Sequence, residues 1–267
     1  MKVFLSADME GTCGIVSWPE TERTTPFDYS PAQKQMTREV AAACRGALSA
    51  GAAEVLVKDA HDSARNIDAA ELPECIRILR GWTGDPLSMM SGLDRDDYGA
   101  VIFTGYHAWA SCPGNPLAHT MNRQNRYVRV NGTIAPELMI NSLTAARFGV
   151  PVRLVTGDRG LCEWMHEQCP GTQTVAVSEG VGRGSISIHP DKAIRLIREA
   201  AERAAKTDAR DCMFPLPGHF RVEVGFKEHF KAKNAASYPG VTQTSPTEIA
   251  FECGDWLDAL RMLDFTL

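Results

Sequence analysis

The chain has 267 residues, of which 44% are hydrophobic, and this is enough for one large domain or two small ones with a real core. Its formal net charge is −5 and no basic stripe occurs, so nucleic acid is not an expected partner. No apolar run approaches the roughly 18 residues of a membrane helix, and the apolar stretch after Met1 is too short for a secretory signal. We therefore expect a globular protein without a membrane segment.

The eight cysteines are scattered along the chain and form no CxxC pair. Without an export signal, this pattern predicts reduced thiols that are mostly small core residues, and a cytoplasmic location. Cys112 is a weak candidate for a nucleophile, because nothing in its sequence context would lower the pKa of the thiol.

In the first half of the chain, apolar runs alternate with helical patterns. Apolar runs predict strands at 2–7, 54–58, 76–79, 100–104 and 127–130. Ser30-Pro31 matches a helix start, and apolar residues at positions 36, 40, 44 and 47 continue that helix up to Gly51. A short helix is expected at 87–93. Asn131-Gly132 favours a tight hairpin turn after the strand at 127–130.

The second half continues the alternation. We expect helices at 136–148, 160–167, 190–206, 227–234 and from Asp255, and strands at 152–156, 174–177, 221–226 and 248–253. The glycine-dense loop GVGRG at 180–184 fits neither GxGxxG nor a phosphate loop, so nucleotide binding is weakly supported. The fold class predicted is α/β, a sheet of largely parallel strands flanked by helices. A Pro-rich change in composition near 208–218 predicts a metal-binding catalytic domain at 1–209 and a smaller C-terminal α+β subdomain at 210–267.

Acidic and imidazole side chains follow the predicted strands of the first half. Asp8 and Glu10 follow the first strand, His61 follows the second, and His107 follows the strand at 100–104. Carboxylate and imidazole are ligands of zinc and similar ions, and parallel strands bring their carboxyl ends to one edge of a sheet. Each residue alone has an ordinary explanation as a loop acid or a backbone-bonded histidine. Together they predict a metal cluster, with a metallohydrolase as the first hypothesis.

Three further residues are ambiguous by spacing alone. Glu137 follows Pro136 and is explained as a first-turn helix acid. Asp59 is a candidate to orient an imidazole. His119 is a candidate base, nucleophile or additional ligand, and spacing does not choose among these roles. A metal-dependent phosphoesterase and a non-catalytic metal-binding scaffold remain as alternative functions.

Five motifs together resemble the D-aminopeptidase family: SADMEG at 6–11, KDAH at 58–61, GYHA at 105–108, AHTM at 118–121 and NGTIAPE at 131–137. They occur in order over most of the chain. The resemblance implies a cytoplasmic zinc aminopeptidase with two Zn²⁺ per chain, acting on short peptides or amides with N-terminal D-residues, such as D-Ala-D-Ala. It also implies a ring-shaped homodecamer with enclosed active sites.

The resemblance assigns roles to individual residues. It implies that Asp8 bridges two zinc ions, and that Glu10, His61, His107 and Glu137 complete their ligand shells. It implies that His119 stands at the position of the catalytic nucleophile. For Glu137 this reverses the interpretation drawn from spacing.

Overall fold

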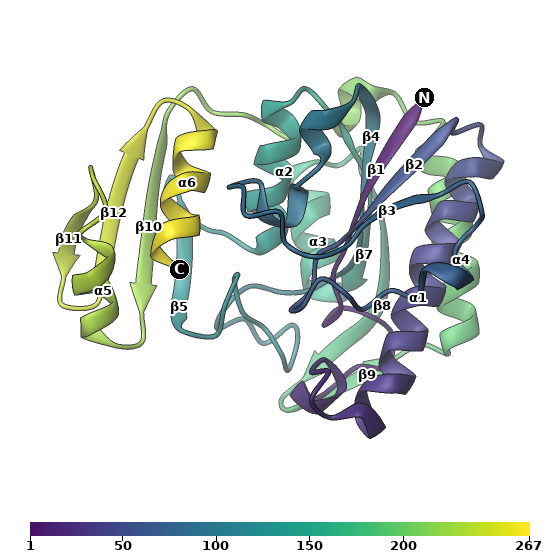
Figure 1. The fold of residues 1–267 in the computed structure, drawn as a ribbon, viewed down its shortest axis with the longest axis horizontal. Helices are drawn as coiled ribbons and strands as arrows, with labels where there is room; N and C mark the ends of the chain where they lie inside the picture. The colour runs from purple at the N-terminus through teal and green to yellow at the C-terminus, as the bar shows by residue number, and fades with distance from the viewer.

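The computed structural model describes residues 1–267, and a seven-stranded sheet forms its larger part (Figure 1). Across this sheet the strands are β3 (Arg77–Leu79), β2 (Glu54–Asp59), β1 (Lys2–Ala7), β4 (Tyr98–Tyr106), β7 (Val152–Asp158), β8 (Gln173–Val181) and β9 (Gly184–Ser187). All neighbours are parallel except β8 and β9, which are antiparallel. The predicted α/β class with a largely parallel sheet is therefore confirmed.

Helices cover both faces of this sheet. Successive residues of each strand point to opposite sides, so the apolar strands present side chains to be buried on both faces. Helices α1 (Pro26–Ser49) and α4 (Pro190–Ala204) pack against each other on one face, where Leu5 of β1 and Val40 of α1 belong to one buried apolar cluster. Helices α2 (Glu137–Arg147) and α3 (Arg159–Gln168) lie on the other face, in the core that contains Phe4. The strands are therefore buried on both sides, which explains their continuous apolar runs.

A second, antiparallel sheet lies beside the first (Figure 1). Its strands are β11 (Thr242–Ser245), β12 (Glu248–Cys253), β10 (Phe220–Phe226), β5 (Asn125–Val130) and β6 (Thr133–Ile134), and its helices are α5 (His229–Ala235) and α6 (Trp256–Thr266). Helix α6 packs against α2, β10 and β12, and the buried Trp256 donates from Nε1 to Thr144 Oγ1 at 3.0 Å. The domain boundary at 209/210 remains a prediction. The second sheet crosses it, because β5 and β6 precede that boundary.

Several predicted elements have different limits in the structure. Helix α1 begins at Pro26, which also suits a first helical position, so Pro31 lies inside the helix. The helix expected at 87–93 is two short 3₁₀ turns, Ser88–Met90 and Leu93–Arg95, separated at Gly92 with φ of 98°. The GVGRG segment forms the β8–β9 hairpin. None of the helices has both the length and the apolar character needed to cross a membrane.

Candidate metal centre

The predicted ligands meet at the carboxyl edge of three adjacent strands. Asp8 follows β1, His61 follows β2 and His107 follows β4, and β1 lies between the other two. The register pairs Ala7 with both Asp59 and Thr104, so β1 and β2 end at one level and β4 ends just beyond it, at Tyr106. A parallel sheet of this order therefore delivers these side chains to one place.

Two more acids reach the same place from other elements. Glu10 lies in the loop after β1, and Glu137 is the first residue of α2. All five side chains are buried, although carboxylates are rarely buried without a partner. Glu137 thus occupies the helix start that spacing predicts and also lies in the cluster that the resemblance implies.

The two carboxylate oxygens of Asp8 face two different groups of potential ligand atoms. Its Oδ1 lies 3.3 Å from His61 Nδ1, and its Oδ2 lies 3.4 Å from His107 Nε2. Glu10 Oε2 lies 3.1 Å from His61 Nδ1, while Glu137 Oε2 lies 3.4 Å from His107 Nε2. The cluster therefore divides into Asp8–Glu10–His61 and Asp8–His107–Glu137, which share one carboxylate.

Backbone carbonyls orient all three imidazoles at this centre. His61 Nε2 donates to Thr21 O (2.9 Å), His107 Nδ1 donates to Ala108 O (2.9 Å), and His119 Nδ1 donates to Leu117 O (3.0 Å). A carbonyl oxygen can only accept, so each of these nitrogens carries a hydrogen. In a neutral ring the other nitrogen then directs a lone pair at the carboxylates. Metal-binding histidines are commonly oriented in this way by a second hydrogen bond.

Several buried atoms of the cluster lack a hydrogen-bond partner. They include Asp8 Oδ2, Glu10 Oε2 and His107 Nε2. Buried polar atoms without partners are rare and costly. A cation among these oxygen and nitrogen atoms would satisfy them all. The residues present therefore fit a divalent ion of the type that takes carboxylate and imidazole ligands.

The electrostatics of the cluster support this interpretation. Burial, together with the nearby Glu10 carboxylate, raises the pKa of Asp8 to about 8. Burial opposes the charged form of His61, but Glu10 and Asp8 hold its pKa well above the ordinary value. Burial is likewise outweighed at His107, where Glu137 and Asp8 raise the pKa. The acids thus favour positive charge at these positions, and a divalent ion would supply it.

Two glycines allow the strand ends to approach closely. A Cβ on Gly11 would lie 1.8 Å from the carbonyl oxygen of Tyr106, and a Cβ on Gly105 would lie 2.2 Å from the carbonyl oxygen of Asp8. Gly105 also has φ of 69°, and the Gly11 N–H donates to its carbonyl at 2.8 Å. The close contact between these segments sets the separation of Asp8 and His107.

Gly11→Ala is therefore expected to push the Asp8 loop away from β4. We expect a loss of about 1–3 kcal/mol in stability, as for other overpacked sites, and weaker metal binding. Thermal unfolding and metal analysis of the purified variant would measure both. Gly218→Ala is the matched control, because a Cβ there has open space. Equal behaviour of the two variants would contradict this explanation of the motif glycine.

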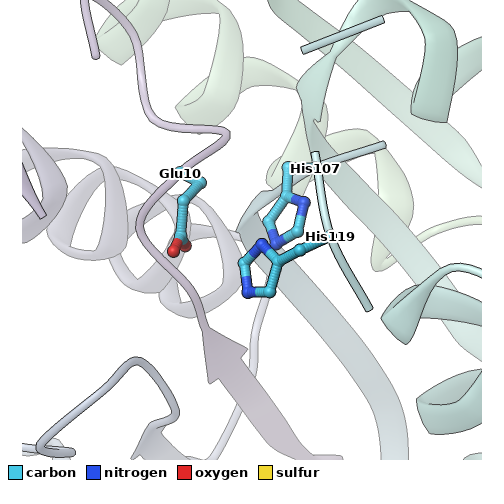
Figure 2. Close-up of side chains that lie close together, drawn as sticks. All are labelled: Glu10, His107 and His119. Atoms are coloured by element: carbon cyan, nitrogen blue, oxygen red, sulfur yellow. The ribbon is translucent and has the colours of Figure 1, made fainter. Parts of the chain in front are cut away.

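His119 lies in the loop after β4, beside the cluster. Its ring stacks on His107 with centroids 4.4 Å apart, and its Nε2 lies 3.6 Å from Glu137 Oε1. Figure 2 shows the two imidazoles stacked beside Glu10. A carboxylate oxygen of Glu10 and a ring nitrogen of each histidine lie within 4.8 Å of one another. At 14% its side chain is the most exposed of the three imidazoles. It is therefore the imidazole most accessible to a substrate.

Sequence reasoning missed Asp158 and Asn115, which hold the loops around the metal centre. Asp158, at the end of β7, accepts from the N–H of Ala108 at 2.7 Å and from Asn115 Nδ2 at 3.2 Å, and Asn115 also donates to the Glu10 carbonyl. An acid after the apolar run at 152–156 was the available signal.

Asp59 was proposed to orient an imidazole, and that prediction is wrong. It accepts from Asn66, which holds the loop after His61 by donating to the His61 carbonyl.

The other candidate residues lie apart from the centre. The remaining histidines are exposed: His166, His189, His219 and His229. Cys112 is half-buried, and burial raises the pKa of its thiol, which does not favour a thiolate nucleophile.

A cavity of about 540 Å³ opens directly over the cluster. Asp8, Glu10, His61, Glu137 and His119 all line it. Such a volume suits a small molecule or a short peptide rather than a folded protein.

Comparison with known proteins identifies the family. A family model described as D-aminopeptidase matches residues 1–265. The chain belongs to the D-aminopeptidase family. It is 32% identical over 270 residues to a D-aminopeptidase of Bacillus subtilis (strain 168), with 98% of this chain and 95% of the relative covered. As a family member the chain is an aminopeptidase, a hydrolase of peptide bonds.

A solved structure of the D-aminopeptidase family shares the whole fold. The Zn-dependent D-aminopeptidase DppA from Bacillus subtilis, described as a self-compartmentalizing protease, superposes with a TM-score of 0.90 at 29% identity. The match covers 98% of this chain and 95% of that chain, so it includes both sheets.

Proposed function

We propose that this D-aminopeptidase family member is a zinc enzyme that removes the N-terminal residue, preferentially a D-amino acid, from short peptides such as D-Ala-D-Ala. The observation that carries the proposal is the position of Asp8, whose two carboxylate oxygens face two separate imidazole–carboxylate groups. A shared carboxylate of this kind is suited to two ions rather than one. The zinc dependence and D-preference named for the Bacillus subtilis relatives support the metal and the substrate.

In this proposal Asp8 would be a ligand shared by two zinc ions. Glu10 and His61 would hold one ion, and His107 and Glu137 the other. Zinc in such a site polarises a carbonyl oxygen and lowers the pKa of bound water. The protein itself fixes the ligands by burial and by the backbone carbonyls that orient each imidazole.

His119 is proposed as the catalytic residue. Its Nδ1 is held by the Leu117 carbonyl, so in the neutral ring Nε2 is free to accept a proton or to attack a carbonyl carbon. The stack on His107 restrains the ring, and the cavity gives a substrate access to it.

The charge of the cavity favours a substrate with a free amine. Besides the proposed zinc ligands Asp8, Glu10 and Glu137, four carboxylate side chains line it, against a single guanidinium. Such a lining attracts an N-terminal ammonium group and repels a phosphate ester dianion. This distribution favours an aminopeptidase over the alternative of a phosphoesterase.

Assembly and location are also part of the proposal. The DppA relative is self-compartmentalizing, and we propose that this chain likewise forms a homo-oligomer, with the decamer as the specific expectation. Large apolar side chains such as Phe27, Phe265 and Ile186 are exposed in the single chain and are available for such contacts. The eight free cysteines are compatible with the proposed cytoplasmic location.

The test combines metal analysis with hydrolysis of D-Ala-D-Ala and of L-Ala-L-Ala by the purified protein. About two zinc ions per chain and selective cleavage of the D,D-peptide are expected. Two ions with neither peptide cleaved would keep the metal centre and reject the substrate. A protein that binds no zinc even after zinc is added would overturn the dinuclear site.

A further inference from the structure

We propose that Arg123 binds the C-terminal carboxylate of the substrate and thereby selects dipeptides and tripeptides. This inference rests on the proposed aminopeptidase function and adds a specificity-determining residue to it. Arg123 lies in the loop that follows His119 and lines the cavity over the metal centre.

The charges of the substrate and of the cavity favour this role for Arg123. A short unblocked peptide carries an ammonium group at one end and a carboxylate at the other. The carboxylate must enter a cavity that four acids line in addition to the proposed zinc ligands Asp8, Glu10 and Glu137. Among the lining residues only Arg123 carries a lysine or arginine cation. It is therefore the one side chain of the lining that compensates the carboxylate with a permanent positive charge.

Two neighbouring side chains hold Arg123 in place. Its guanidinium carbon lies 4.2 Å from the centroid of the Trp18 ring, and its Nη1 donates to Glu22 Oε1 at 3.3 Å. Stacking on an aromatic face and an ion pair restrain a side chain that is otherwise flexible. Arginine has five N–H donors in a planar fork, so donors remain for a second carboxylate. The side chain is 56% exposed and thus accessible to a ligand.

Arg123 also lies at a suitable distance from His119. The same Trp18 ring meets His119 edge-on, with ring centroids 5.5 Å apart. One indole therefore separates the guanidinium from the proposed catalytic imidazole. An extended residue spans about 3.5 Å, so a carboxylate one or two residues beyond the scissile bond reaches Arg123 when that bond lies at His119. Longer peptides would carry their carboxylate past it.

The experiment compares a free-acid dipeptide with its C-terminal amide. Wild type, Arg123→Gln and Arg126→Gln are assayed on D-Ala-D-Ala and D-Ala-D-Ala amide. Arg126 is the matched control because it is exposed three residues away, pairs with Glu248 and does not line the cavity. Zinc content and thermal midpoint are recorded for each variant, so that a folding or metal defect is recognised.

For Arg123→Gln we expect kcat/KM on the free-acid peptide to fall about 10- to 100-fold, mainly through KM, because a charged hydrogen-bonded pair is lost. The amide should be cleaved by both proteins at rates within about twofold, because it makes no such pair. On the free-acid peptide, the kcat/KM of Arg123→Lys should lie between those of wild type and Arg123→Gln, since lysine keeps the charge but lacks the planar set of N–H donors. Arg126→Gln should match wild type.

Two results would reject the inference, and they are distinguishable. An unchanged ratio of free-acid to amide activity in Arg123→Gln rejects the role of Arg123 while the aminopeptidase function stands. Failure of wild type to cleave either peptide, with zinc bound, rejects the proposed substrate class and the inference with it.

Discussion

Asp8→Asn is expected to remove most of the bound zinc and to lower kcat/KM at least about 100-fold, since even residues behind a metal ligand contribute 10- to 100-fold. Asp8 is the only carboxylate with oxygens within 3.4 Å of a ring nitrogen of both His61 and His107. An amide of the same shape keeps the volume but loses the negative charge and one acceptor oxygen. The loss should therefore affect both proposed ion positions at once. Metal analysis of the dialysed variant and peptide assays measure the two effects.

Asp62→Asn is the control for that substitution. Asp62 lines the same cavity and is exposed, and it lies outside the cluster of ligand-type atoms. It should retain its zinc and most of its activity. If Asp8→Asn bound as much zinc as this control, Asp8 would not be a bridging ligand. Loss of one ion with retention of the other would assign Asp8 to a single position.

His119→Ala is expected to lower kcat about 10²- to 10⁴-fold with the zinc content unchanged, the range typical of a general acid–base residue. The reason is its position outside the two groups that share Asp8, together with its free Nε2 and its access to the cavity. Steady-state kinetics and metal analysis of the same preparation give the two quantities.

The outcomes for His119 separate its possible roles. Activity lost together with zinc would make His119 a ligand, as its proximity to Glu10 and His107 also allows. Full activity would remove it from the mechanism. His166→Ala, at an exposed position on α3, should behave as wild type in both assays.

Local patterns carried the prediction of the strand ends. The apolar runs before Asp8, His61 and His107 are buried parallel strands, and alternation along the chain was enough to predict them. Helix limits were less well predicted at α1, where Pro26 and Pro31 both suit a helix start and only packing chooses between them. The start of α6 next to Asp255 and the β12 strand were predicted closely because their signals are local.

Glu137 shows where spacing was insufficient. Its position after Pro136 correctly predicted the first turn of α2, but the same residue also faces His107 at 3.4 Å. A one-dimensional pattern describes the neighbours within a turn of helix, and His107 is far outside that range. Only the five motifs taken together pointed to the second role.

By itself the sequence determined which residue types stand at the strand ends, which segments alternate between strand and helix, and that glycine is present where Gly11 passes Tyr106. The tertiary structure decided that β1 lies between β2 and β4, and that β5 joins the C-terminal strands in a second sheet. It also decided that each oxygen of Asp8 faces a different imidazole and that Arg123 shares the cavity with His119. The physical reason is range. Periodicity and capping act over a few residues, whereas strand order and the direction of a buried side chain depend on packing between segments far apart in the chain.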